Sequence, residues 1–359
     1  MPIIGIDTNG LYTTQAGVAR YIRGLLNGLK RVAAPDLQVR TLAWEVDNFL
    51  YRQPERALKT IYRELIWARF NALLQLRKYN VALLHSTAGP LIHRPQSVSE
   101  VVTLHDLAVL RNPERFRSWQ AASARRRLTK VRRADHVICI SRFTADEAMA
   151  LLNLPASKFI VVHNGCEFHP SEPVPPEAKP DFRLPTEYFL FVGSLEPGKN
   201  LALLKKVYAL AESRKHLLPP LLIVGARWEG VAHEGPPLQG WHYLGRLPDA
   251  VLVYLYRHAT GLVFPSKYEG FGFPVAEAMS LGCPVICSPV ASLPEVGGAA
   301  ALFTDMKPEA YLNAMRQFNR EASLRNELIE KGFAQAANFS WAKCASEVLE
   351  VYRATLQLT

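Results

Sequence analysis

The chain has 359 residues, more than one compact domain usually holds, so two domains are expected. Hydrophobic residues make up 49% and charged residues 21%, a balance that excludes a wholly disordered chain, a collagen and a coiled coil. Lys and Arg outnumber Asp and Glu by 42 to 32, and this surplus of +10 is compatible with nucleic acid, an anionic membrane or a phosphorylated substrate.

The compartment is predicted from the amino terminus and the cysteines. The opening residues, MPIIGIDTNG, lack the basic segment, apolar stretch and cleavage site of a signal peptide. No apolar run reaches the ~18 residues of a membrane-spanning helix. Five scattered cysteines make a poor disulfide framework, and Cys283 and Cys287 lack a second ligand pair nearby, so buried thiols are expected rather than zinc. A cytoplasmic protein is expected.

Short apolar runs alternate with helical patterns along the whole chain. In the first half the runs predict strands at 3–6, 81–85, 101–104, 137–140 and 159–162. In the second half they predict strands at 188–192, 221–224, 261–264, 285–286 and 301–303. Helical patterns such as Leu201–Arg214 and Pro308–Asn319 separate them. This alternation predicts an α/β protein with two Rossmann-like domains, whose parallel sheets face an interdomain cleft.

A proline-rich stretch at 166–185 separates the two halves. Six of its twenty residues are proline, which fixes φ and lacks the amide proton, so an extended linker is predicted. The predicted organisation is therefore a first domain at 1–165, the linker, a second domain at 186–340 and a final helix at 341–359.

The positive charge is confined to the first half. Residues 1–165 hold 24 Lys and Arg against 12 Asp and Glu, and residues 166–359 hold 18 against 20. The densest basic stretch runs from Arg111 to Arg133 and includes Arg125–Arg127. Two interpretations remain: a solvated helical face, or a patch for anionic lipid headgroups or a lipid-diphosphate acceptor. Nucleic acid is not expected, because no DNA- or RNA-binding signature accompanies the stretch.

The segment 261–296, GLVFPSKYEGFGFPVAEAMSLGCPVICSPVASLPEV, carries the strongest chemical pattern. A predicted strand leads into a loop with two glycines, which let a ligand approach the backbone, and a helix then begins near Pro274. Exposed amides at that helix start favour an anion. Glu269 and Glu277 flank the loop, where both can face one ligand. The alternative is one surface glutamate and one that interacts with the helix dipole.

This segment resembles the E-x7-E signature of glycosyltransferase family 4, retaining enzymes of the GT-B fold that use sugar nucleotides. The resemblance implies that Glu277 holds the nucleotide ribose and that Glu269 meets the donor sugar near the reacting carbon. It also implies that the backbone amides of Phe271, Gly272 and Phe273 hold the sugar and phosphate side.

Further matches extend the resemblance along the chain. QAGVARY at 15–21 places Gly17 where the family approaches the donor diphosphate, and TLHDL at 103–107 places His105 beside the donor sugar, with Asp106 to orient it. The ending FSWAKCASEVLEVYRATL resembles the family's last helix, which crosses back onto the first domain.

The diphosphate motif departs from the family pattern. In FVGSLEPGKN at 191–200, Ser194 and Gly198 stand where the family often has arginine, and Lys199 remains. Ser194 and Lys199 are expected to line the donor diphosphate. One lysine offers a single point charge without the bidentate fork of arginine, so Arg246 and Lys267 are considered as substitutes.

The predicted function is transfer of a hexose, with GDP-mannose favoured over UDP-hexoses, to a saccharide or lipid-linked acceptor in surface polysaccharide assembly. Lys199 would stabilise the leaving diphosphate, and the GT-B pattern implies no metal or other cofactor. The basic first half suggests attachment to the inner face of the plasma membrane. Two alternatives are a glycoside hydrolase with paired carboxylates and a nucleotide-sugar- or glycan-binding protein without activity.

Overall fold

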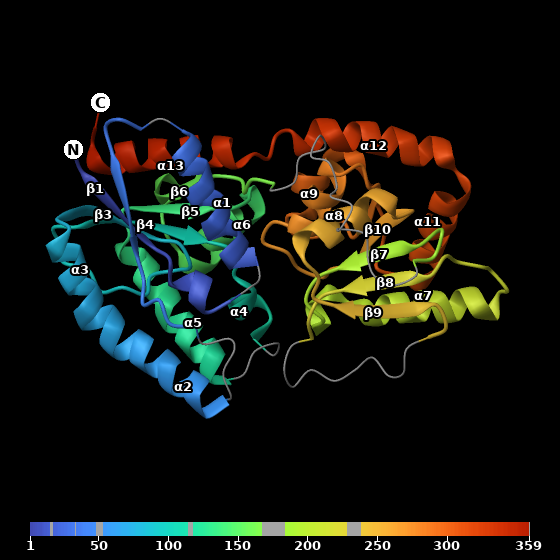
Figure 1. Cartoon of the computed structure of the whole chain (residues 1–359), viewed down its shortest axis with the longest axis horizontal. Coiled ribbons are helices and arrows are strands. Elements are labelled where there is room, and N and C mark those ends of the chain that lie inside the picture. The colour runs from blue at the N-terminus through green and yellow to red at the C-terminus, as the bar shows by residue number, and fades with distance from the viewer. Residues whose placement is uncertain are drawn as a thin grey trace. The chain divides into compact units, whose positions relative to one another are not determined.

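The computed structural model describes residues 1–14, 17–32, 34–47, 53–113, 118–166, 184–227 and 238–358. The chain divides into two compact units, one made of residues 1–165 together with 340–359 and the other of residues 166–339 (Figure 1). Most of the linker predicted at 166–185 lies outside the described residues.

The first unit is built on six parallel strands in the order β2-β1-β3-β4-β5-β6. The strands are β1 (Ile3–Asp7), β2 (Gln38–Leu42), β3 (Val81–Ser86), β4 (Ser99–Leu104), β5 (His136–Cys139) and β6 (Phe159–Val161). Its helices are α1 (Gly17–Arg31), α2 (Gln53–Ile61), a π-helix (Tyr62–Asn71), α3 (Ala72–Lys78), α4 (Ala108–Arg111), α5 (Ser118–Lys130), α6 (Arg142–Leu152) and α13 (Trp341–Leu356).

The second unit also has six parallel strands, in the order β12-β11-β10-β7-β8-β9. They are β7 (Phe189–Val192), β8 (Leu221–Val224), β9 (Trp241–Gly245), β10 (Gly261–Phe264), β11 (Val285–Cys287) and β12 (Ala301–Phe303). The helices are α7 (Leu201–Ser213), α8 (Asp249–His258), α9 (Phe273–Ser280), α10 (Leu293–Gly297), α11 (Pro308–Arg320) and α12 (Ala322–Ala336). The strand order reverses between β7 and β10, and ligands bind at such a reversal in open α/β sheets.

The predicted α/β fold is confirmed, and every predicted strand is present to within two residues at each end. The strands β2 and β9 were not predicted. Both lie at a sheet edge, and each exposes part of its length to solvent. Their sequences, QVRTL and WHYLG, therefore mix polar with apolar residues and lack the continuous apolar run of a buried strand.

Helices cover both faces of the first sheet because successive side chains of a strand point to opposite faces. Leu84 packs with Trp67 of the π-helix and Leu76 of α3. The next residue, His85, forms a hydrogen bond with Tyr352 of α13. The helical segment 62–78 and α13 therefore lie on opposite faces of this sheet (Figure 1).

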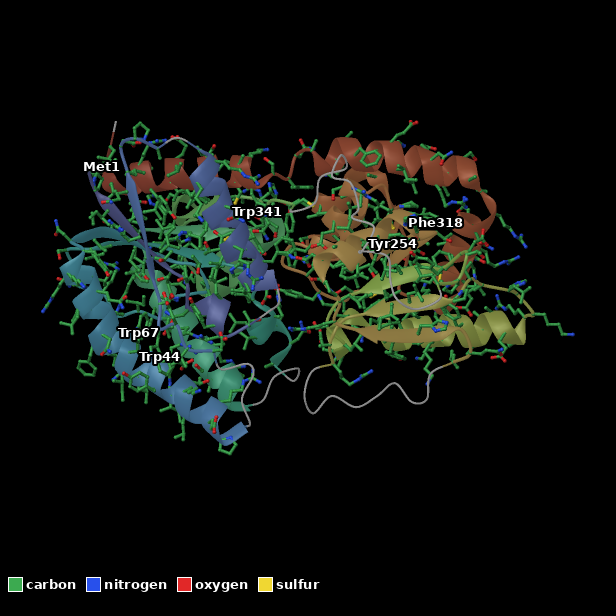
Figure 2. The ribbon with its side chains drawn as sticks, viewed as in Figure 1. Met1, Trp44, Trp67, Tyr254, Phe318 and Trp341 are labelled. Carbon is green, nitrogen blue, oxygen red and sulfur yellow. The ribbon has the colours of Figure 1, made fainter. Side chains whose placement is uncertain are left out.

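Three glycines make room for Trp341 at the start of α13, the residue labelled in Figure 2. A Cβ on Gly24 would lie 2.0 Å from the Trp341 ring, and one on Gly165 would lie 2.3 Å from the Trp341 amide nitrogen. On Gly28 it would lie 2.2 Å from the Trp341 carbonyl oxygen. Helix α1 and the loop after β6 can therefore approach the start of α13 this closely only without side chains at these positions.

Replacing Gly28 with alanine should destabilise the protein, although alanine normally stabilises a helix interior by up to about 1 kcal/mol. The new methyl group would meet backbone, which cannot rotate away, so we expect Gly28→Ala to lower the free energy of unfolding by about 1–3 kcal/mol. The exposed neighbour provides the control, since Asn27→Ala should change it by less than about 0.5 kcal/mol. Denaturant unfolding measures both, and a stabilised Gly28→Ala variant would contradict the close approach.

Candidate active site

The residues Lys199 and Glu269, singled out from separate motifs, meet where the strand order of the second sheet reverses. Lys199 follows β7 and Glu269 follows β10, and these two strands are paired. Lys199 Nζ and Glu269 Oε1 form an ion pair, with 17% and 11% of the side chains exposed. The ammonium also lies 5.6 Å from the centroid of the Phe264 ring. The pair therefore holds a cation and a carboxylate ready at the edge where such sheets bind ligands.

Backbone contacts fix the turn that carries Lys199. The Glu196 carboxylate accepts a 2.7 Å hydrogen bond from the amide of Gly198. The carbonyl of Gly198 in turn accepts a 2.8 Å hydrogen bond from the amide of Lys267, in the loop after β10. The loops after the two paired strands are thus tied together, which limits how far Lys199 can move from Glu269.

The glycine-rich loop leads into α9, as predicted for a strand–loop–helix segment. Gly272 has a φ of 100° and immediately precedes the helix. A left-handed backbone of this kind favours glycine. The hydroxyl of Ser292 donates to the carbonyl oxygens of Glu269, at 3.0 Å, and Phe271, at 2.8 Å. Phe271 is buried and its ring contacts that of Phe273 edge to face. The hydrogen bonds from Ser292 and the packing of Phe271 therefore fix the backbone of this loop.

Glu277 lies in α9 with only 1% of its surface exposed. The hydroxyl of Tyr256, in α8, donates a 3.2 Å hydrogen bond to Glu277 Oε2. A buried carboxylate must be compensated by hydrogen bonds, so Glu277 is a positioned group and not a solvated surface residue.

A further cation, Arg227, follows β8 beside the turn that contains Ser194. Ser194 is half-buried, and the next residue, Leu195, forms a parallel bridge with Arg227 and donates a 2.9 Å backbone hydrogen bond to Ala226. Arg246 and Lys267 were expected from the sequence as substitutes for the absent arginine, whereas Arg227 was not. The signal was present, because β7 and β8 are consecutive strands of a βαβ unit and their carboxyl ends lie side by side. Arg246 follows β9, one strand further away.

In the first unit, His105 follows β4 and is oriented by a backbone carbonyl. His105 Nε2 donates a 2.8 Å hydrogen bond to the Thr87 carbonyl oxygen, and the ring lies 4.9 Å from that of Tyr21. Burial lowers the pKa of His105 below its usual value, more than Thr87 and Asp106 raise it. In the neutral ring Nε2 carries the proton, which leaves Nδ1 as a hydrogen-bond acceptor.

Asp106 and Gly17 are the other two residues of the first unit that the family resemblance singled out. Asp106 accepts a 3.0 Å hydrogen bond from the amide of Ala108 at the start of α4, whereas the His105 ring donates its hydrogen bond to the carbonyl of Thr87 and not to Asp106. Gly17 begins α1 and is exposed, next to residues 15 and 16, which are not described.

A buried hydrogen-bond network of uncharged side chains includes Tyr21, whose ring contacts that of His105. His85 forms hydrogen bonds of 2.6 Å with the Tyr352 hydroxyl and 2.7 Å with the Thr103 hydroxyl, which also contacts the Tyr21 hydroxyl at 3.0 Å. Burial lowers the pKa of His85 to about 3. The network joins α1, β3, β4 and α13, so it fixes the Tyr21 ring against which His105 packs.

The low pKa of His85 predicts a pH-dependent stability. The unfolded chain protonates this histidine below a pH of about 6.5, while the folded chain does not until about pH 3. The stability that depends on neutral His85 is therefore complete above pH 6.5 and is lost as the pH falls. Between pH 7 and 5 the free energy of unfolding of the wild type should fall by about 2 kcal/mol relative to His85→Gln.

Denaturant unfolding at a series of pH values measures this difference. The matched control is His242→Gln, at an exposed position of β9, which should follow the wild-type slope. Parallel curves for wild type and His85→Gln would contradict a neutral, buried His85.

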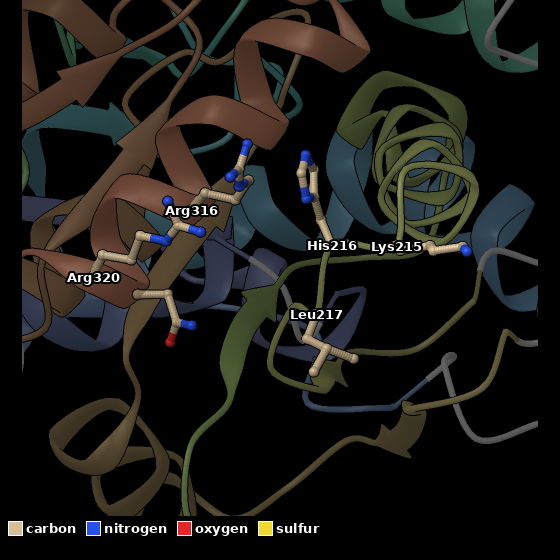
Figure 3. Close-up of a pocket in the computed structure, with 6 residues that line it drawn as sticks. Lys215, His216, Leu217, Arg316 and Arg320 are labelled. Carbon is tan, nitrogen blue, oxygen red and sulfur yellow. The ribbon is translucent and has the colours of Figure 1, made fainter.

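A hollow of about 280 Å³ in the second unit lies away from these residues (Figure 3). It is lined by Lys215, His216, Leu217, Arg316, Asn319 and Arg320. These residues lie at or just beyond the carboxyl ends of α7 and α11. Because both helices run back from the carboxyl edge of the sheet, the hollow is at the opposite edge from Lys199 and is not the predicted donor site.

In the basic stretch from Arg111 to Arg133, some arginines form contacts within the protein and others are exposed. Arg111 forms a 2.6 Å ion pair with the buried Glu147, and Arg132 donates a 2.8 Å hydrogen bond to the carbonyl of Leu152. Arg125 and Arg126 are exposed on α5. The interpretation as a solvated or ligand-facing surface therefore applies to only part of the stretch.

The cysteines are all buried as free thiols. Within the ranges that the structure describes, no group of three or more His, Cys, Asp or Glu side chains is placed to hold a metal ion.

Comparison with known proteins identifies the family. Residues 16–168 match the family described as Glycosyltransferase Family 4, and residues 177–335 match Glycosyl transferases group 1. The O-antigen chain mannosyltransferase B of Escherichia coli is 34% identical over 320 residues, which cover 85% of this chain and 82% of the relative. The chain belongs to glycosyltransferase family 4.

This glycosyltransferase is also similar in sequence to one further protein and in fold to another. The serotype-specific mannosyltransferase WbdA of Escherichia coli is 28% identical over 278 residues, 72% of this chain but only 34% of that protein. Sucrose-phosphate synthase from Thermosynechococcus elongatus superposes with a TM-score of 0.71 over 100% of both chains at 18% identity. This likeness concerns the fold, and the glycosyltransferase has the GT-B fold that the sequence resemblance implied.

Proposed function

We propose that this glycosyltransferase transfers mannose from GDP-mannose to a saccharide or lipid-linked acceptor in the assembly of a surface polysaccharide. The relative that is 34% identical over most of both chains is named for mannosyl transfer to an O-antigen chain, which supports this choice of sugar and process. The structural observation that carries the proposal is the Lys199–Glu269 ion pair at the reversal of strand order.

In this proposal the donor diphosphate and Glu269 share Lys199. When the donor binds, the Lys199 ammonium also forms an ion pair with the phosphates, and its interaction with Glu269 weakens. The Glu269 carboxylate can then accept hydrogen bonds from the hydroxyls of the donor sugar. When the bond to the sugar breaks, negative charge grows on the leaving diphosphate, and a cation already in place stabilises it without reorganisation. Glu277, held by Tyr256, binds the ribose hydroxyls.

Arg227 is proposed to supply the second positive charge that the diphosphate motif lacks. It lies beside the turn of Ser194, where the resemblance leads one to expect an arginine. Its planar guanidinium can donate two parallel hydrogen bonds to a phosphate, which a lysine cannot. With Lys199 and Arg227 both present, transfer is proposed to proceed without a bound metal ion. His105 is proposed to meet the donor sugar through Nδ1 as an acceptor.

The alternative of a binding protein without activity is not favoured, because the chain belongs to a family of enzymes and keeps both motif glutamates together with Lys199. Family membership also disfavours the glycoside hydrolase alternative.

We further propose that the enzyme works in the cytoplasm at the inner face of the plasma membrane. The five buried free thiols suit a reducing compartment. The net charge of residues 1–165 (24 − 12 = +12) suits an anionic surface.

A donor panel tests the proposed function. Thermal unfolding with GDP-mannose, GDP, UDP-glucose and UDP should show the largest stabilisation with the guanosine compounds, because a ligand that binds only the folded chain raises its stability. Stabilisation by uridine compounds alone would contradict the choice of GDP-mannose. Absence of stabilisation by every nucleotide would contradict the donor site itself.

Three single variants should separate the proposed roles in calorimetric titrations and transfer assays. Glu277→Ala removes the ribose contact and should weaken guanosine and GDP alike, by roughly 10-fold or more. Arg227→Ala should weaken GDP by a similar factor and leave guanosine unchanged. His105→Ala should lower kcat with little change in donor affinity.

Lys206, on α7, provides a matched cation control for Arg227, and Lys206→Ala should leave GDP affinity unchanged. If Arg227→Ala weakened the binding of guanosine and GDP equally, the proposed contact between Arg227 and phosphate would be contradicted.

A further inference from the structure

The continuous helical segment at residues 53–78 of the first unit exposes large apolar side chains along its outer face. It consists of α2, the π-helix and α3. The exposed apolar residues are Leu58, Ile61, Leu65, Ile66, Phe70 and Leu74. Leu58, Phe70 and Leu74 expose 68%, 63% and 64% of their surface. We call these six residues the apolar rows.

The apolar rows are separate from the side of the segment that packs on the protein. Leu58 and Ile61 lie in α2, Leu65, Ile66 and Phe70 in the π-helix and Leu74 in α3, so exposed apolar side chains recur along the whole segment. The buried positions Trp67, Ala72 and Leu76 pack against the β-sheet instead. A helix that is apolar on both sides is expected to be covered on both sides, and contiguous exposed apolar surface marks an interaction site.

Positive charge borders the apolar rows. Arg56, Arg69, Arg77 and Lys78 are exposed on the same segment. The single exposed acid among residues 54–78 is Glu55. Helix α5, with the exposed Arg125 and Arg126, packs alongside (Figure 1), where Ser123 donates a 3.2 Å hydrogen bond to Glu64. Apolar side chains bordered by Lys and Arg are typical of helices that lie in the interface of an anionic bilayer.

We infer that the segment 53–78 lies on the surface of an anionic bilayer, with the apolar rows at the boundary of headgroups and acyl chains and the bordering cations at lipid phosphates. This inference rests on the membrane attachment proposed above and assigns it to one segment. Among the described residues no helix has the length and apolarity of a membrane-spanning helix. A second copy of this face is a poorer occupant, because a symmetric contact would bring the cations near one another.

Three adjacent exposed positions allow a matched test in vesicle co-sedimentation. Phe70→Gln should weaken binding to vesicles of phosphatidylcholine and phosphatidylglycerol by roughly 10-fold or more at low and at high salt, because an apolar anchor is lost. Arg69→Gln should weaken it by about 5-fold at low salt only, because salt screens a lost charge. Asn71→Gln should bind as the wild type does, and pure phosphatidylcholine vesicles should bind every form weakly.

Thermal stabilisation by the donor nucleotide, measured on the same preparations, shows that each variant is folded and tests the donor site independently. Donor stabilisation with no vesicle binding by the wild type would overturn the inference and leave the transfer reaction standing. Vesicle binding that Phe70→Gln leaves unchanged would overturn the assignment to this segment. Dimerisation of the wild type without vesicle binding, abolished by Phe70→Gln in sedimentation velocity, would show that a second copy covers the apolar rows.

Discussion

The reversal of strand order between β7 and β10 is the constraint on which the candidate site of the second unit depends. Strands on either side of such a reversal send their following loops in different directions, which leaves a gap at the carboxyl edge of the sheet. Here the gap is bordered by a lysine from one loop and a glutamate from the other, and the two form an ion pair. Opposite charges offset the cost of holding either one in a partly buried place. In the proposed reaction the same pair offers a cation to phosphate and a carboxylate to hydroxyl groups.

The first unit positions His105 by a different means, a buried network of uncharged polar side chains between close-packed helices and the sheet. His85 is uncharged and fully buried, and its two ring nitrogens are both used. Helix α13 contributes Tyr352 to this network and reaches its place only because Gly24 and Gly28 of α1 leave room for Trp341. The last residues of the chain thus support the ring of Tyr21, on which His105 packs. The support of His105 therefore extends over elements that are distant in sequence.

The sequence predicted what is local and buried, and it missed what depends on neighbours across a sheet. The strand at 261–264 and the helix after Gly272 follow from an apolar run, glycines and a proline in close succession. Glu269 and Lys199 were each found from their motifs, but their ion pair depends on the pairing of β7 with β10, which no local pattern specifies. The position of Arg227 beside the turn of Ser194 depends instead on the pairing of β7 with β8, which the βαβ order of these strands already indicated. The edge strand β9 was missed because its exposed residues, His242, Tyr243 and Gly245, interrupt the apolar run expected of a buried strand.

The buried thiols give the molecule built-in reporters of unfolding. Burial raises the pKa of Cys139 and Cys344 in the first unit and of Cys283 and Cys287 in the second. A thiol reacts through its thiolate, so these groups resist alkylating reagents while each unit stays closed. Alkylation therefore follows opening events, and peptide mapping assigns each modified cysteine to one unit or the other. The wild-type sequence thereby allows the opening rates of the first and second units to be compared without introduced labels.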